Sequence, residues 1–177
     1  NDAFEAQGIP YQPIKYQDLN QVVAGYLQGR CAAMTSDRSQ LAAARSGFTD
    51  PKQHSILDAV LSKEPLAPLS VGGDQRLGDA MRWVVYALIT AEELGITSDN
   101  AAATAADADA SAGVKRLLGV EGGYGAMLGL ADDAFLNAIS QVGNYAESFE
   151  RNVGPDTAVG LDRGLNALWT DGGILYA

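Results

Sequence analysis

The feature that most constrains the fold is an apolar run that leads directly into an amphipathic helix, within residues 29–46. Cys31 to Thr35 form a mostly apolar run long enough for a buried strand, and an alanine-rich helical pattern follows without a spacer. Ser36 and Asp37 therefore fall at a strand-to-helix junction. In open α/β sheets this edge, beyond the carboxyl ends of the strands, is where ligands bind.

Asp37 also has a plain structural interpretation. With Gln40 three residues later it fits a variant of the capping box, in which its carboxylate caps the helix that follows. The spacing alone favours the cap over a ligand site. The same carboxylate could perform both roles.

Two other short runs complete a predicted α/β region. Tyr11 to Tyr16 alternates in the way of a strand weakened by Pro13, and Ser55 to Val60 supplies a third apolar run. Between the runs Tyr11 to Tyr16 and Cys31 to Thr35, Asp18 is predicted to cap a helix with an apolar stripe over residues 19–27. Strands and helices that alternate in this order predict right-handed crossovers and a largely parallel sheet.

The second part of the chain has a helical character. Prolines and paired glycines in residues 62–74 predict an extended segment that crosses between two structural units. A long helical period begins at Leu77 and ends at Gly95, and another helix is predicted over residues 161–169. The five glycines of residues 119–129 predict a flexible connection rather than a phosphate-binding loop, because no strand precedes them.

Composition excludes several classes of function. Twelve basic and 22 acidic residues give a formal net charge of −10, which repels nucleic acid and anionic lipid. No apolar run of about 18 residues is present, so no membrane insertion is predicted. The first residues lack the pattern of a signal peptide, which neither shows nor excludes export.

Cysteine and histidine are too few for a metal or redox site. Cys31 is the only cysteine and His54 the only histidine, so no internal disulfide and no zinc cluster is predicted. We expect Cys31 to be buried in its strand and His54 to lie at the surface. No cofactor and no metal is predicted.

Several strings, in order along nearly the whole chain, resemble one family, the substrate-binding proteins of ABC importers for polar and general L-amino acids, in the branch with an extended C-terminus. The strings are Gly29-Arg30-Cys31 with Ser36-Asp37-Arg38-Ser39-Gln40-Leu41, Ser62-Lys63-Glu64-Pro65-Leu66, Arg82-Trp83-Val84-Val85-Tyr86-Ala87-Leu88, Ala91-Glu92-Glu93-Leu94-Gly95-Ile96, Leu117-Leu118-Gly119-Val120-Glu121-Gly122, Gln141-Val142-Gly143-Asn144-Tyr145, Phe149-Glu150-Arg151-Asn152-Val153-Gly154, and Arg163-Gly164-Leu165-Asn166-Ala167-Leu168-Trp169 with Asp171-Gly172-Gly173.

The resemblance implies an α/β fold, as part of a two-lobed periplasmic binding protein of type II with a mainly helical C-terminal extension. It implies that the chain is a C-terminal portion, with about as many residues again upstream. Residues 1–63 would be the remainder of lobe two, residues 64–73 a hinge between the lobes, and residues 74–177 the helical return to lobe one and the extension.

The resemblance also implies a function and a site. Asp37 matches the family's ligand carboxylate, which holds the α-ammonium of an amino acid, and Ser36 is the neighbour expected to contact the ligand. The arginine that grips the α-carboxylate would lie upstream. Ala32 departs from the family pattern, where an acidic residue is common. The implied partners are an L-amino acid and the membrane permease of an ABC importer, the implied location is the periplasm, and the full-length precursor would carry a signal peptide.

Two other classes of function make different demands on the sequence. An enzyme is not predicted, because the sequence shows no carboxylates paired at a defined spacing, no Ser-His-Asp set and no G-x-S-x-G turn of an α/β hydrolase. A helical module for protein interaction is the alternative, with apolar stripes between Leu77 and Trp169 packing on a partner.

Overall fold

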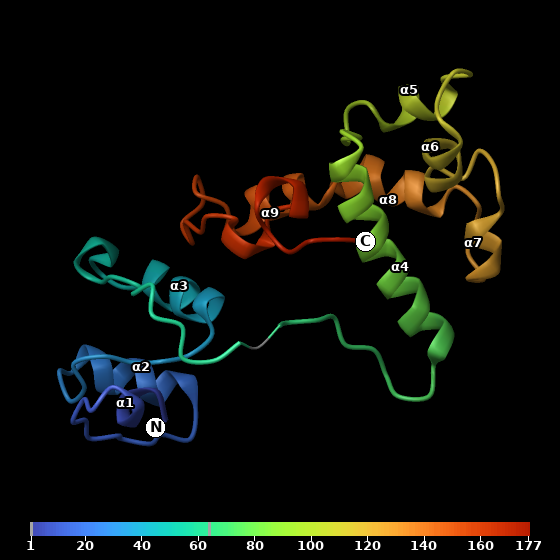
Figure 1. Ribbon diagram of the computed structural model, residues 1–177. Helices are drawn as coiled ribbons and strands as arrows, with labels where there is room; N and C mark the ends of the chain where they lie inside the picture. Colours follow the sequence, from blue (N-terminus) through green and yellow to red (C-terminus); the bar gives the residue numbers. More distant parts are fainter. Residues whose placement is uncertain (1, 64) are drawn as a thin grey trace. The chain divides into compact units, whose positions relative to one another are not determined.

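The computed structural model describes residues 2–63 and 65–177, which form two compact units, Asn1–Pro65 (unit 1) and Leu66–Ala177 (unit 2). Unit 1 contains the helices α1 (Asp2–Ala6), α2 (Leu19–Leu27) and α3 (Arg38–Ser46) and the 3₁₀ turn η1 (Pro51–Gln53). Unit 2 contains α4 (Gln75–Glu93), α5 (Ala101–Ala106), α6 (Ala112–Leu117), α7 (Tyr124–Met127), α8 (Ala134–Val142), α9 (Tyr145–Val153), η2 (Gly164–Asn166) and η3 (Trp169–Asp171). Figure 1 labels the α-helices.

Unit 1 is held together by aromatic contacts around α2. The Asp18 side chain accepts a hydrogen bond from the backbone N–H of Gln21, which confirms the predicted cap of α2. Near the end of α2, the ring of Tyr26 meets those of Phe48 and His54, with centroid separations of 6.2 and 5.5 Å. The segment that follows α3 is thereby fixed against α2.

The three predicted strands are not formed among residues 2–63. Tyr11 to Tyr16, Cys31 to Thr35 and Ser55 to Val60 contain no strand, and the one isolated β-bridge in the described chain joins Leu168 and Leu175 in unit 2. A strand exists through its hydrogen bonds to a neighbouring strand. The apolar pattern was present, but none of these segments has such a neighbour within the described residues.

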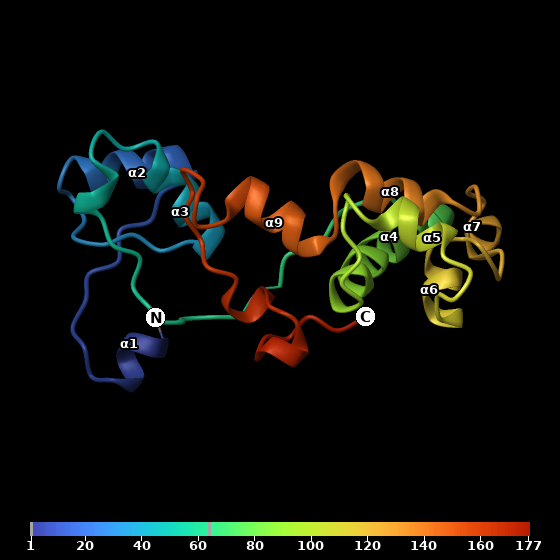
Figure 2. The ribbon, with the colours of Figure 1, turned by 90° about the horizontal axis from the view of Figure 1, so that it is seen from above.

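The core of unit 2 lies where the second half of α4 meets α8. Figures 1 and 2 show that α8 and α9 both meet α4, with α5 beside α8 and α6 beside α5. The buried side chains that pack together here are Ala91, Ile96, Ala101, Leu118 and Ile139. The end of α4 at Gly95 is as the sequence predicted, and Gly95 takes a left-handed conformation there, with φ of +68°.

One helix predicted in unit 2 is not formed. The turns η2 and η3 replace the predicted helix over residues 161–169. Gly164 takes a φ of +49°, whereas every residue of an α-helix has a negative φ. The predicted connection over residues 119–129 contains the short helix α7, in which Ala126 N–H donates to Asp132 Oδ1 at 3.2 Å.

The glycines of this connection make room for close backbone contacts. A Cβ added at the buried Gly125 would lie 2.6 Å from the carbonyl carbon of Ala131. We therefore expect Gly125→Ala to lower the free energy of unfolding by about 1–3 kcal/mol. Gly113 in α6 is the matched control, since its Cβ would meet nothing nearer than 3.8 Å, and Gly113→Ala should be neutral or stabilising. Urea unfolding of both variants measures the difference, and equal effects would contradict the close contact.

A buried capping box joins α9 to the loop after α4. Asn144 and Glu147 cap α9 reciprocally, through Glu147 N–H to Asn144 Oδ1 at 3.0 Å and Asn144 N–H to Glu147 Oε2 at 2.8 Å. The Ser98 N–H donates to the same Glu147 carboxylate at 3.1 Å, and the Asn144 amide donates to the Ile96 carbonyl at 2.9 Å. Burial by itself raises the pKa of the Glu147 carboxyl, but the hydrogen bonds from Ser98 and Asn144 outweigh it and lower the pKa below the ordinary value of 4.5.

The lowered pKa of Glu147 predicts a loss of stability in acid. The ionised Glu147 carboxylate adds to the free energy of unfolding above about pH 4.5, which is the pKa of this group in the unfolded chain. This contribution is lost as the pH falls through the lower pKa of the folded state. Glu147→Gln should flatten the dependence of the free energy of unfolding on pH below this point. The exposed Glu150 of the same helix provides the control Glu150→Gln. If both variants keep the acid slope of the parent, the hydrogen bonds to Glu147 carry no such linkage.

Candidate functional site

The predicted site residues lie at the end of an arm that connects α2 to α3. Gly29, with a φ of +72°, ends α2, and the N–H of Arg30 donates to the Gly25 carbonyl at 3.0 Å, which is the pattern of a Schellman motif. Residues 30–37, which we call the arm, then run without helix or strand to the first turn of α3. Ser36 and Asp37 are its last two residues.

Asp37 precedes α3 but does not cap it with its side chain. Its backbone carbonyl accepts the hydrogen bond from the Leu41 N–H at 2.9 Å, whereas its carboxylate makes no capping hydrogen bond. The predicted capping box with Gln40 is therefore wrong, because the Ser36 hydroxyl donates to the Gln40 side-chain oxygen instead. Within the described residues the Asp37 carboxylate has no hydrogen bond and no ion pair, and the residue is half-buried.

The other charges near the arm do not neutralise Asp37. Arg38 pairs with Asp58 at 3.9 Å, and the two side chains are 60% and 99% exposed, so this ion pair is weak. Ser36 is half-buried, and its oxygen keeps its own lone pairs as it donates to Gln40. The end of the arm thus presents a free anionic group beside a hydroxyl.

Cys31 and His54 each lie beside a tyrosine. Both residues are half-buried, so the predictions of a buried Cys31 and a surface His54 are both wrong. The Cys31 sulfur lies 4.0 Å from the hydroxyl of Tyr16, and Nδ1 of His54 lies 2.8 Å from the hydroxyl of Tyr26. Each therefore packs against a tyrosine, and no cluster of metal ligands occurs in the described part of the chain.

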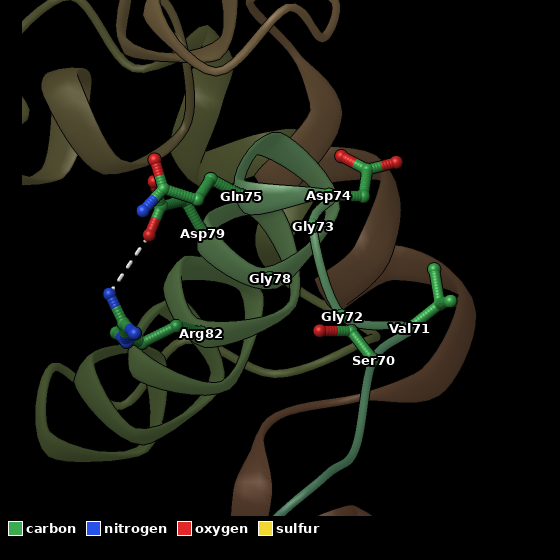
Figure 3. A pocket seen from close by; sticks show the side chains of 9 residues that line it. All are labelled: Ser70, Val71, Gly72, Gly73, Asp74, Gln75, Gly78, Asp79 and Arg82. Carbon is green, nitrogen blue, oxygen red and sulfur yellow. Dashed lines mark hydrogen bonds and ion pairs between the residues drawn. The ribbon is translucent and has the colours of Figure 1, made fainter.

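A hollow in unit 2 is lined by none of the predicted site residues. It has a volume of about 340 Å³ at the start of α4, and Figure 3 shows the side chains that line it, among them Ser70, Asp74, Asp79 and Arg82. Arg82 and Asp79 pair with each other across 2.9 Å. Their side chains are 59% and 49% exposed, so the hollow is open to solvent.

Sequence reasoning missed the contact between Tyr16 and Gly25. Gly25 is buried in the middle of α2, and a Cβ there would lie 2.6 Å from Cζ of Tyr16. A signal for this contact was present, because a glycine inside a helix costs about 1 kcal/mol relative to alanine and often marks a close approach.

Comparison with known proteins shows what the chain is related to. It is 42% identical over 176 residues to the glutamate/glutamine/aspartate/asparagine-binding protein BztA of Rhodobacter capsulatus, and 42% identical over 178 residues to the general L-amino acid-binding periplasmic protein AapJ of Rhizobium johnstonii. Each match covers 99% of this chain and 52% of the relative. The chain thus spans about half the length of these relatives. No protein-family model matches it.

The fold of this chain is similar to that of a solved protein. The ABC transporter periplasmic binding protein from Brucella ovis with glutathione bound is 40% identical, with a TM-score of 0.90 over 99% of this chain and 55% of the solved one. The predicted resemblance to substrate-binding proteins of amino-acid ABC transporters is confirmed, and the chain corresponds to the C-terminal part of these proteins. No helix in the described ranges has the length and apolar character needed to cross a membrane.

Proposed function

We propose that this chain, a relative of the substrate-binding proteins of amino-acid ABC transporters, is the C-terminal half of a periplasmic protein that binds L-amino acids and delivers them to a membrane permease. The observation that carries this proposal is the unpaired carboxylate of Asp37, in a chain that matches amino-acid-binding relatives over 99% of its length. The full-length protein is this chain joined to a counterpart of the other half of its relatives.

The chemistry of Asp37 suits the α-ammonium group of an amino acid. Moving an ammonium group out of water is costly unless an anionic acceptor replaces the water, and a carboxylate forms short, charge-assisted hydrogen bonds to it. Because the Asp37 carboxylate has no partner in the described chain, a ligand breaks no internal hydrogen bond when it binds. The Ser36 oxygen is the second expected contact. No bond is made or broken in this role, so we propose a binding protein and no enzyme.

The relatives suggest the range of ligands and the architecture. Their names describe binding of glutamate, glutamine, aspartate and asparagine in one case and of general L-amino acids in another, and the solved relative holds glutathione. We propose a ligand with a free α-amino-acid end. The other half would supply the groups that bind the α-carboxylate and the strands that pair with the arm, giving the two-lobed α/β fold of type II.

The division of the chain into lobes is also part of the proposal. Residues 1–63 would belong to lobe two, residues 64–73 to the hinge, and residues 74–177 to lobe one and its extension. Residue 64 of this hinge lies outside the described residues. Residues 65–71 contain neither helix nor strand, and Leu69 is 92% exposed, which supports a crossing segment.

Thermal unfolding with a panel of L-amino acids tests the proposal. A ligand that binds only the folded state stabilises it, by about 2.7 kcal/mol at a concentration of 100 times its Kd. We expect the full-length protein to be stabilised by several L-amino acids and not by their N-acetyl forms, which lack the ammonium charge. If no L-amino acid changes the unfolding temperature, the transport function is wrong and a helical module for protein interaction remains.

A further inference from the structure

We infer that Tyr16, seated on Gly25 of α2, is a positioning residue that fixes the arm carrying Asp37. The inference rests on the proposed function and goes beyond it, since it assigns a role in ligand binding to two residues that do not touch the ligand. The observation behind it is that hydrogen bonds fix the backbone of the arm at its two ends and not between them.

The backbone of the arm has no hydrogen bonds between its two ends. Residues 31–36 exchange no backbone–backbone hydrogen bond with any other described residue. At the far end, the first turn of α3 and the bond from Ser36 to Gln40 fix the chain. At the near end, the Schellman motif of α2 fixes only the residue that enters the arm, Arg30.

Tyr16 supplies the contact that continues this anchor into the arm. Its hydroxyl lies 4.0 Å from the sulfur of Cys31, the second residue of the arm. The edge of the same ring rests on α2, in space that any side chain at Gly25 would fill. Gly25 also accepts the hydrogen bond from the N–H of Arg30 that ends α2. One glycine thus seats the ring and joins the helix to the arm.

This arrangement ties the direction of the arm to α2. If the ring is removed, the near end of the arm keeps only its backbone link to α2, and the Asp37 carboxylate can shift relative to a bound ammonium group. Charge-assisted hydrogen bonds depend on distance and direction, so a small shift weakens binding. The loss should be the same for all L-amino acids, because the ammonium group is common to them.

The test compares variants of the full-length protein by calorimetric titration with several L-amino acids, at a temperature at which every variant is folded. Tyr16→Ala should raise the Kd of all of them by a similar factor of about ten, the effect of weakening one hydrogen bond to a charged group. Tyr16→Phe keeps the ring on Gly25 but removes the hydroxyl beside Cys31, so its Kd should lie between those of Tyr16→Ala and the parent. Tyr11→Ala is the control, because Tyr11 is half-buried in the same unit and stacks on Phe4, with ring centroids 4.9 Å apart.

A second variant and a second readout separate positioning from folding. Gly25→Ala favours the helix but displaces the ring, so it should reproduce the uniform loss even if Tyr16→Ala fails to fold. Labelling of the Cys31 thiol, followed by mass spectrometry, should be faster in Tyr16→Ala and Gly25→Ala than in Tyr16→Phe and the parent. Faster labelling together with the uniform loss supports the inference.

The failures of the two proposals are distinguishable. If Tyr16→Ala and Gly25→Ala are folded and bind like the parent, while Asp37→Asn loses affinity, the positioning role is wrong and the proposed function stands. If the parent itself binds no L-amino acid, the proposed function is wrong and the positioning role falls with it.

Discussion

Asp37→Asn in the full-length protein is expected to weaken the binding of every L-amino acid by about 30- to 1000-fold. The substitution removes the negative charge with almost no change in shape, and breaking a desolvated charge pair costs about 2–4 kcal/mol. Folding should hardly change, because this carboxylate makes no hydrogen bond or ion pair within the described chain. Titration calorimetry with acidic, amide and aliphatic amino acids measures the effect.

The matched control for this substitution is Asp58→Asn. It removes the same charge from the same unit, at a side chain that is 99% exposed, and should leave the affinities unchanged. A loss confined to one class of amino-acid side chain in Asp37→Asn would show that Asp37 contacts the side chain of the ligand and not its ammonium group.

The largest expected effect on stability comes from Arg163→Ala. The Arg163 guanidinium donates to both oxygens of Glu92 at 2.9 and 3.0 Å and to the Asn166 carbonyl, and it lies 5.4 and 5.3 Å from the ring centroids of Tyr145 and Phe149. The two charged side chains are only 17% and 12% exposed. Alanine would leave the Glu92 carboxylate mostly buried without its partner, at a cost of about 3 kcal/mol in the free energy of unfolding.

A second ion pair of unit 2 serves as the control. Arg82 and Asp79 are also 2.9 Å apart, but their side chains are 59% and 49% exposed. Arg82→Ala should therefore cost less than about 1 kcal/mol. Adding Glu92→Gln to Arg163→Ala should recover part of the loss, because it removes the unpaired charge. Urea unfolding tests all of these variants, and equal costs for Arg163→Ala and Arg82→Ala would contradict the role of burial.

Local signals in the sequence predicted the helices well. The cap at Asp18, the helix end at Gly95 and the long period of α4 depend on residues within a few positions of one another, and all are present in the structure. The helix predicted over residues 161–169 is absent. Its apolar spacing was right for a helix, but Gly164 has a positive φ and Arg163 binds Glu92, which is distant in the sequence.

The strands show the limit of pattern reasoning. Cys31 to Thr35 has the composition of a buried strand, yet a strand also needs a hydrogen-bonded neighbour, and none of the described residues provides one. The same reasoning located Asp37 correctly at the start of α3, because the helical pattern that follows is local. It could not foresee that the Ser36 hydroxyl donates a hydrogen bond to the Gln40 side chain, while the Asp37 carboxylate makes none to the helix.

The most direct test of the central claim is a crystal structure of the full-length protein with an L-amino acid bound. We expect an Asp37 carboxylate oxygen to lie about 2.7–2.9 Å from the α-nitrogen of the ligand, the usual length of a charge-assisted hydrogen bond. An Asp37 carboxylate that points away from the ligand, with the α-nitrogen bound by other groups, would contradict the assignment of this site.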